Sequence, residues 1–452
     1  MSYESSGESI AALIGELGDI PHSVEPSLLR RRSRDYFWYS QALAADLDGK
    51  LADVVVTPRN RSDVLRVAAA CARLRVPLTP RGAGTGNYGQ SVPLQGGVVL
   101  DMSEMNAIEW VRTGAMRVQP GARMHLVDEM LRPGGQELRL HPSTKRSATI
   151  GGFVAGGSGG VGSVTWGGLR EPGNILAARI VTLEETPRVI ELRGDAAQKV
   201  NRAYGTTGVI IALEMPLAPL WEWIDVAVAC DDFASACEIG LAVALADGVV
   251  KKLLSPIAWP IPRYFGPFAS ACPEGRSLLI AMIAKPSLET FKTMLGRRGQ
   301  IVHERLFDES PTETPIYEYT WNHTTLHVLK TDRDVSYQQC LFPADRVLES
   351  VAEMVALFGD EVWHHLEFIR FGGRVTASAL PVVRFTTRER LFEIVEIYER
   401  HGVLVANPHV YTLEDGSRHK RADADQLGFK AEVDPHGLLN PGKMRSYTPV
   451  RP

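Results

Sequence analysis

Two glycine-rich stretches, about sixty residues apart, constrain this chain more than any other feature of its sequence. The first is Pro80–Ser91 (PRGAGTGNYGQS) and the second is Pro142–Ser163 (PSTKRSATIGGFVAGGSGGVGS). Glycine lets a backbone approach a ligand closely and adopt positive φ, and successive N–H groups in such loops form anion-binding concavities. One such loop is often a surface turn. Two in one domain indicate a ligand with more than one phosphate, or an extended cofactor.

Bulk composition narrows the class of protein. A chain of 452 residues suggests two domains, and 44% hydrophobic with 23% charged residues is typical of a soluble globular protein. The net charge of −4 argues against nucleic acid or an anionic membrane as partner. The five cysteines include no CxxC pair, which indicates free thiols in a reducing compartment. We find no secretory signal and no apolar run long enough for a membrane span, so we expect a cytoplasmic protein without a transmembrane segment.

The region of the first glycine stretch has the pattern of a β-α-β unit. Val54–Val56 predicts a strand, Ser62 is a plausible N-cap of the helix that follows, and Arg75–Pro80 and Gly97–Asp101 predict two more strands. The glycine stretch therefore follows the second strand of the unit.

Further along, the pattern predicts a hairpin, a helix and a strand before the composition changes. Ile175–Leu183 and Arg188–Leu192 form the expected hairpin, Asp195 caps a helix to Tyr204, and a strand from Val209 to Leu217 is ended by Pro216 and Pro219. After Trp221 the glycine loops stop and amphipathic helices appear at Asp345–Phe358 and Thr386–His401.

We expect four parts of the chain. Residues 1–45 are an N-terminal extension, whose arginines Arg30, Arg31, Arg32 and Arg34 make a solvated helix face. Residues 46–221 form the glycine-loop domain and 222–430 a second domain. The tail 431–452 is rich in turn residues, but its apolar Leu438 and Leu439 favour burial, so we expect it to return to the first domain.

The segment Gly84–Gly89 formally matches the G-x-G-x-x-G dinucleotide motif. That motif requires a helix directly after the loop, because the helix N-terminus holds the pyrophosphate. Pro93 and Gly96-Gly97 follow here instead and forbid a helix. The sequence therefore predicts an anion-binding loop outside a Rossmann fold.

Six short pieces together carry a family resemblance. They are, in chain order, Pro80–Thr85, Val98–Asp101, His141–Thr144, Ala148–Gly152, Gly205–Ile210 and Asn440–Lys443. In this order they resemble the FAD-linked oxidases of the vanillyl-alcohol oxidase and p-cresol methylhydroxylase (PCMH) type, and most of all the bacterial glycolate and D-lactate dehydrogenase group. The resemblance covers about residues 46–221 and the tail.

The resemblance implies an α+β protein, in which a PCMH-type FAD-binding domain of two subdomains carries an α+β substrate, or cap, domain. FAD would lie extended between the subdomains, with its pyrophosphate over the first stretch. The implied FAD-binding residues are Pro80, Arg81, Gly82, Ala83, Gly84, Thr85, Gly86, Asn87, Gly89, Gln90, Ser91, Pro142, Ser143, Thr149, Ile150, Gly151, Gly152, Ala155, Gly156, Gly159, Gly160, Ser163, Val209, Ile210, Asn440 and Lys443.

Some members of this family bind flavin covalently through a histidine at the place of Thr85, and others add a cysteine in the second stretch. Thr85 cannot form that bond, and no cysteine lies between Cys71 and Cys230. We therefore expect non-covalent FAD.

The substrate domain should supply a base for the hydroxyl proton and, for an acid substrate, a cationic clamp. His409 is the candidate base, Arg370 the candidate clamp, and Tyr411 a candidate hydrogen-bonding residue. His323 and His327 share a helix face and are either a metal pair or polar residues near a pocket. We predict no metal, because the H-x-G-x-G-N-like context of metal-dependent relatives is absent. His365 and Glu367 point to one side of a strand and are further candidates.

The sequence thus predicts an FAD-dependent oxidoreductase that oxidises an alcohol group, of a 2-hydroxy acid or a sugar-like acid. Two alternatives stay open: a non-redox flavin-adduct enzyme on the same scaffold, and a flavin-binding subunit of a multi-subunit oxidase. Without an Fe–S cysteine motif, the electron acceptor is oxygen, a quinone, a cytochrome or a partner protein.

Overall fold

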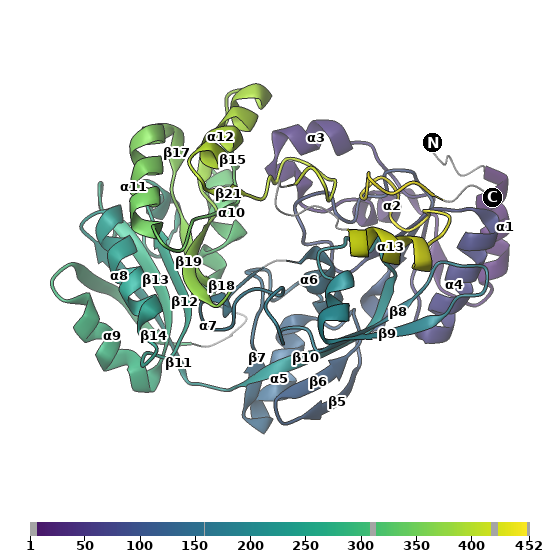
Figure 1. Cartoon of the computed structure of the whole chain (residues 1–452), viewed down its shortest axis with the longest axis horizontal. Coiled ribbons are helices and arrows are strands. Elements are labelled where there is room, and N and C mark those ends of the chain that lie inside the picture. The colour runs from purple at the N-terminus through teal and green to yellow at the C-terminus, as the bar shows by residue number, and fades with distance from the viewer. Residues whose placement is uncertain (1–6, 158, 308–312, 417–423, 450–452) are drawn as a thin grey trace.

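The computed structural model describes residues 7–157, 159–307, 313–416 and 424–449. Helices and strands are mixed throughout, as Figure 1 shows. The purple and blue sheets of the N-terminal half lie on one side and the green sheets of residues 223–405 on the other. The chain crosses from one side to the other between β10 (Val209–Pro219) and β11 (Trp223–Cys230). The predicted α+β class is confirmed.

The first sheet contains the predicted β-α-β unit. Strands β2 (Val54–Val56) and β3 (Leu78–Arg81) both pair parallel to β4 (Val98–Asp101), and α4 (Arg61–Leu74) connects β2 to β3. The N-cap of α4 is Asn60 instead of Ser62, because the Asn60 side chain accepts the N–H of Asp63. The sheet order is β1 (His22–Ser23), β2 (Val54–Val56), β4 (Val98–Asp101), β3 (Leu78–Arg81).

The N-terminal segment packs on this first sheet. Helix α1 (Gly7–Leu17) contacts α4 and buries Leu13 and Leu17, while β1 pairs antiparallel with β2. Helices α2 (Pro26–Arg32) and α3 (Gln41–Leu47) follow. The arginine face is not entirely solvated, since Arg32 Nε lies 2.7 Å from the buried carboxylate of Asp101.

The second sheet is antiparallel and contains the predicted hairpin. Its order is β5 (Ile108–Arg112), β6 (Ala115–Val118), β10 (Val209–Pro219), β8 (Ala177–Val181), β9 (Val189–Arg193), with β7 (Gln136–Leu138) also on β10. Strand β10 does not end at Pro216. Pro216 pairs with Ala115 at the end of the β10–β6 ladder, and the β10–β7 ladder begins at the next residue, where Leu217 pairs with Leu138. Because Pro216 stands between the two ladders, its missing N–H disrupts few hydrogen bonds.

The helix expected from Asp195 to Tyr204 is wrong. Only a 3₁₀ turn, Gly194–Lys199, forms. Arg202 and Tyr204 have φ of 53° and 52°, which no helix accommodates. Helices α5 (Met124–Leu131), α6 (Ile150–Gly156) and α7 (Ser163–Trp166) complete this half.

The other half is built on a third, antiparallel sheet covered by helices α8 (Phe233–Leu245) and α9 (Leu288–Leu295). Its order is β12 (Lys251–Ile257), β13 (Ser277–Ala284), β11 (Trp223–Cys230), β14 (Gly299–Leu306). Two smaller sheets follow, β15 (Val335–Tyr337), β20 (Val382–Arg384), β17 (Val362–Trp363), and β18 (Leu366–Phe371), β19 (Arg374–Ala379), β16 (Cys340–Leu341), β21 (Leu404–Val405). The two predicted amphipathic helices are confirmed as α11 (Val347–Phe358) and α12 (Arg388–Arg400).

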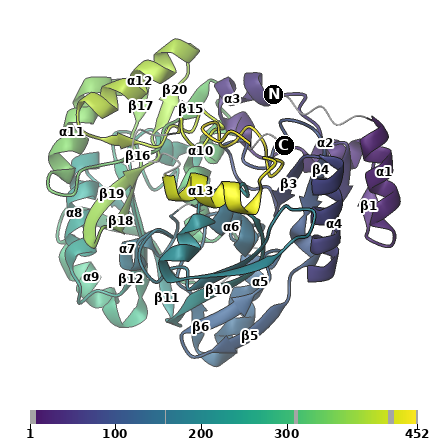
Figure 2. The ribbon, with the colours of Figure 1, turned by 45° about the vertical axis from the view of Figure 1, so that its right-hand side comes forward.

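The tail packs against both sheets of the N-terminal half. Helix α13 (Ala424–Val433) lies over the region of α6 and β10 in Figure 2. Leu438 and Leu439 are fully buried in the core of the first sheet, and the N–H of Leu78 donates to the carbonyl of Leu438 at 2.8 Å. Along the described part of the chain, no helix is long and apolar enough to cross a membrane.

Candidate functional site

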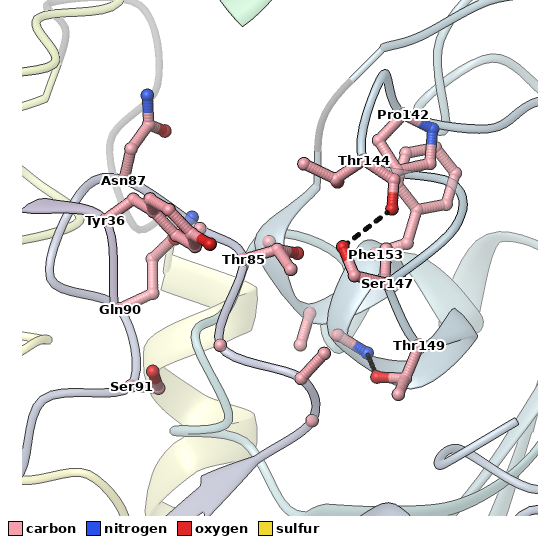
Figure 3. A pocket seen from close by; sticks show the side chains of 18 of the residues that line it. Tyr36, Thr85, Asn87, Gln90, Ser91, Pro142, Thr144, Ser147, Thr149 and Phe153 are labelled. Carbon is pink, nitrogen blue, oxygen red and sulfur yellow. Dashed lines mark hydrogen bonds between the residues drawn. The ribbon is translucent and has the colours of Figure 1, made fainter. Parts of the chain in front are cut away.

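Both glycine stretches line one pocket, with a cavity volume of about 450 Å³. The third wall is the segment that leads into helix α10 (Asn322–Leu329), from Glu318 to Leu326, and Tyr36 and Tyr39 close another side. In Figure 3 the side chains of the first stretch face those of the second, and Thr85 lies between the two groups. A cavity of this size suits an organic ligand.

The first stretch is a loop wrapped around a buried arginine. The N–H groups of the Arg81 guanidinium donate from Nη1 to the carbonyl of Arg34 at 2.6 Å and to Ser91 Oγ at 3.0 Å. Gly84 has φ of +69°, and a Cβ there would lie 2.0 Å from Arg81 Nη2. Only glycine fits this position without displacing the arginine. As expected, no helix follows the loop.

The second stretch meets the first at close range. Thr149 is the N-cap of α6 and accepts the N–H of Gly152, the bond drawn in Figure 3. A Cβ on Gly82 would lie 2.1 Å from Thr149 Oγ1, so glycine at this position allows the two stretches to touch. Their exposed backbone therefore forms one continuous surface along the pocket.

Most of the residues predicted to bind FAD line this pocket. They are Pro80, Arg81, Gly82, Ala83, Gly84, Thr85, Gly86, Asn87, Gln90, Ser91, Pro142, Ser143, Thr149, Gly151, Gly152, Ala155, Gly156, Gly159 and Ile210. The structure places the others outside the lining: Gly89, Ile150, Gly160, Ser163, Val209, Asn440 and Lys443. Ile150 and Val209, for example, are fully buried in the hydrophobic cores of the second and first sheets.

Asn440 and Lys443 lie behind the first stretch and not at the open pocket. Asn440 Nδ2 donates to the carbonyls of Gln90 and Tyr204, both at 2.7 Å, and Lys443 Nζ donates to the carbonyl of Gly89 at 2.5 Å. Burial lowers the pKa of Lys443 to about 7, against the attraction of Asp35. Burial also raises the pKa of Asp35 to about 6, against the attraction of Lys443 and Arg81. The tail thus holds the loop through a buried charge cluster.

Among the predicted catalytic residues, His323 lines the pocket. Burial lowers the pKa of His323 to about 4, so its imidazole is neutral near pH 7. His327 is turned away: its ring stacks on Tyr319 at 4.6 Å, and its Nε2 lies 3.1 Å from the carbonyl of Glu318. Among the described residues, no group of three His, Cys, Asp or Glu side chains is arranged to hold a metal ion.

His409, Arg370 and Tyr411 lie outside the pocket lining. His409 is fully buried with its Nδ1 2.8 Å from Ser40 Oγ, and burial lowers its pKa to about 3. Arg370, at the end of β18, pairs instead with Asp247 at 2.7 Å. Lys443 Nζ lies over the Tyr411 ring, 5.1 Å from its centroid. The structure therefore does not bring the expected base and clamp together at one site.

Several lining residues were missed from the sequence. Tyr36, Tyr39, Tyr204, Gln339 and Arg146 all line the pocket. Arg146 lies inside the second glycine stretch, where it follows Lys145, and this pair of cations was an available signal. No local pattern marks the others, because the fold brings them to the pocket from distant segments.

Four buried polar atoms of the lining have no hydrogen-bond partner among the described residues. Three belong to donors, Arg81 Nε, Asn87 Nδ2 and Trp321 Nε1, and the fourth is the acceptor Asn322 Oδ1. Leaving such groups unpaired is costly, so a pocket lined by them favours a ligand rich in hydrogen-bonding oxygens.

Comparison with known proteins identifies the family. Residues 52–191 match the family model described as "FAD binding domain". This range contains most of both walls of the pocket. This part of the chain is thus similar to a known FAD-binding domain. The resemblance predicted from the six sequence pieces is confirmed, and the chain fits the glycolate and D-lactate dehydrogenase-like group.

Among curated relatives, this chain is 31% identical over 209 residues to glycolate oxidase subunit GlcD of Escherichia coli, covering 44% of this chain and 41% of that one. It is 33% identical over 170 residues to D-2-hydroxyglutarate dehydrogenase of E. coli, 34% of this chain and 16% of that one. It is 29% identical over 180 residues to the mitochondrial cytochrome-type D-lactate dehydrogenase of Arabidopsis thaliana, covering 38% of this chain and 30% of that one. The matches thus span less than half of each relative.

The fold likeness extends through both halves. A solved structure of alkyldihydroxyacetonephosphate synthase superimposes with a TM-score of 0.71 at 15% identity, covering 97% of this chain and 85% of that one. The two-half architecture described above is therefore the fold of that solved structure.

The pocket residues fit FAD. Glycine-rich backbone from both stretches lines the pocket, and such backbone can follow a diphosphate and a flat ring system closely. The unpaired donors on Arg81 and Asn87 lie on the first stretch, where a diphosphate would need them. These two residues, with the backbone of Gly82–Gly86 and Gly151–Gly152, would hold the cofactor.

Proposed function

We propose that this chain is an FAD-dependent oxidoreductase that oxidises the CH–OH group of a 2-hydroxy acid, with FAD held non-covalently. The observation that carries the proposal is the single pocket in which both glycine stretches face the cap segment Glu318–Leu326. The names of the curated relatives support the substrate class: glycolate, D-2-hydroxyglutarate and D-lactate are all 2-hydroxy acids.

Bound FAD would supply the hydride-accepting ring for this chemistry. His323 would take the hydroxyl proton, because it lines the pocket and its low pKa keeps the imidazole neutral. The substrate carboxylate would face Arg146, a cation of the lining that lies 3.6 Å from Glu318. Loss of a hydride and a proton converts the CH–OH group to a carbonyl.

Two features of the described pocket support non-covalent FAD. The position at which some family members carry the linking histidine is Thr85, which lines the pocket. Each of the five cysteines is buried, and none belongs to the described lining.

An anaerobic substrate screen tests the proposal. Glycolate, D-lactate and D-2-hydroxyglutarate are each added to the FAD-loaded protein while the oxidised-flavin absorption band is followed. Bleaching of the band by one of them supports a 2-hydroxy acid oxidoreductase. An unchanged band with all three, in protein with full flavin occupancy, overturns the proposed substrate class. The bleached protein is then mixed with oxygen, a quinone analogue or cytochrome c, and the acceptor is the one that restores the band.

A further inference from the structure

A buried cluster in the cap half contacts the pocket lining through the backbone N–H of Trp321. Glu367 Oε1 lies 2.9 Å from His365 Nε2 and accepts from Ser255 Oγ at 3.2 Å. The same oxygen accepts the N–H of Trp321 at 2.7 Å. Ser255, His365 and Glu367 are all 0–1% exposed and lie outside the pocket lining. The cluster therefore reaches the pocket through Trp321.

Trp321 has an unfavourable backbone conformation. Its φ of 53° and ψ of −142° belong to a region that glycine adopts far more readily than tryptophan. Such a conformation costs on the order of 1–3 kcal/mol and persists only where the surroundings determine it. The hydrogen bond to Glu367 is the contact that fixes the Trp321 N–H here. The cluster thus holds a strained residue in one orientation.

This orientation places the indole in the pocket. Trp321 is 7% exposed and lines the pocket, and a Cβ on Gly159 would lie 3.0 Å from its Cη2. The indole Nε1 has no hydrogen-bond partner among the described residues. An indole N–H is a donor only, and a buried one usually has an acceptor. An oxygen of a bound molecule would satisfy it.

The position of Trp321 indicates which bound molecule this is. The unpaired donors of Arg81 and Asn87 lie on the first glycine stretch, whereas Trp321 belongs to the cap wall, next to His323. We propose that Trp321 is a substrate-binding residue whose indole N–H donates to a substrate oxygen, and that Glu367 is the positioning residue that sets its orientation. This inference rests on the proposed function.

The first experiment needs no substrate. The protein is labelled with [¹⁵N]tryptophan, and the indole N–H resonance of Trp321, among the eight tryptophans, is assigned by its loss in Trp321→Phe. We expect this resonance to move in Glu367→Gln, because that change alters the acceptor of the Trp321 backbone N–H. The control Glu361→Gln changes a carboxylate that pairs with Arg390, away from the pocket, and should leave it unchanged. A resonance that is unchanged in Glu367→Gln overturns the proposal.

The second experiment measures substrate binding. With the acid that bleaches the flavin band, Trp321→Phe should raise KM about 5-fold, the loss of one neutral hydrogen bond, with the FAD dissociation constant unchanged. Trp363→Phe is the matched control, because Trp363 is equally buried at 8% exposed but lies outside the pocket lining. An unchanged KM in Trp321→Phe refutes the role. If none of the three acids bleaches the wild-type flavin, the proposed function fails. The resonance experiment then still tests whether Glu367 sets the orientation of Trp321.

Discussion

Gly84→Ala is the sharpest test of the first glycine stretch, because two effects can be separated by a matched control. Gly84 has φ of +69° and Gly135 has φ of +67°, but no atom lies within 4 Å of a Cβ placed on Gly135. Alanine at either site carries the same backbone cost, about 1–2 kcal/mol. Only at Gly84 does the new methyl group also collide with a buried guanidinium, 2.0 Å from Arg81 Nη2.

The collision determines the expected loss of FAD affinity. The Arg81 guanidinium must leave the place where it holds the Arg34 carbonyl and Ser91 Oγ. Hydrogen bonds from a charged group contribute about 1.5–3 kcal/mol each, so losing both loosens the loop by at least about 3 kcal/mol. We therefore expect Gly84→Ala to weaken FAD binding about 100-fold.

The assay combines thermal unfolding with flavin-fluorescence titration. In the absence of FAD, the backbone cost should lower the free energy of unfolding by a similar amount in both variants. Gly84→Ala should lose more, because it must also move Arg81. Only Gly84→Ala should lose affinity for FAD. If Gly84→Ala and Gly135→Ala bind FAD within about 2-fold of each other, the arginine-centred loop is not part of the cofactor site.

Three further predictions follow from the pocket and its surroundings. Acid precipitation should release all flavin colour into the supernatant, since Thr85 offers no linking nitrogen; colour in the pellet contradicts non-covalent binding. His323→Gln should lower kcat by roughly 10²–10⁴ with FAD still bound, and wild-type turnover would exclude His323 as the base. His409→Gln should leave kcat unchanged but flatten the acid side of the stability profile. Because burial lowers the pKa of His409 to about 3 from an unfolded value near 6.5, its contribution is complete above pH 6.5 and lost as pH falls toward 3. Urea unfolding at pH 7 and pH 4.5 measures how much the free energy of unfolding falls between these two pH values. An equal fall in His409→Gln and in the wild type contradicts this role of His409 in stability.

The cofactor half could be predicted because its signals are local. Glycine positions such as Gly82 and Gly84 are required by contacts made within a few residues or by the partner stretch, so they leave a direct mark on the sequence. The same holds for the β-α-β unit around Val54–Asp101, whose strands and helix each follow a simple periodicity. The helix expected at Asp195–Tyr204 fails for a reason invisible in its pattern: the positive φ of Arg202 and Tyr204.

The substrate side could not be predicted in the same way, because it is assembled from distant segments. Arg370 looked like a clamp among apolar neighbours, but it stands at the end of β18, where its side chain reaches Asp247. His409 follows a strand as a catalytic residue often does, yet it packs fully buried against Ser40 from the N-terminal segment. The position of each side chain depends on a partner more than a hundred residues away in the sequence. A local sequence pattern carries no information about such a partner.

The structure thus gives the two halves separable roles. Around the first stretch, the buried charges of Asp35, Arg81 and Lys443 hold loop backbone. Around the cap wall, Glu367 holds the backbone of Trp321. Because no hydrogen bond or ion pair described here joins the two clusters, changes to one should alter FAD affinity and changes to the other should alter substrate affinity. A Glu367 variant with weakened FAD binding and normal substrate KM would contradict this division.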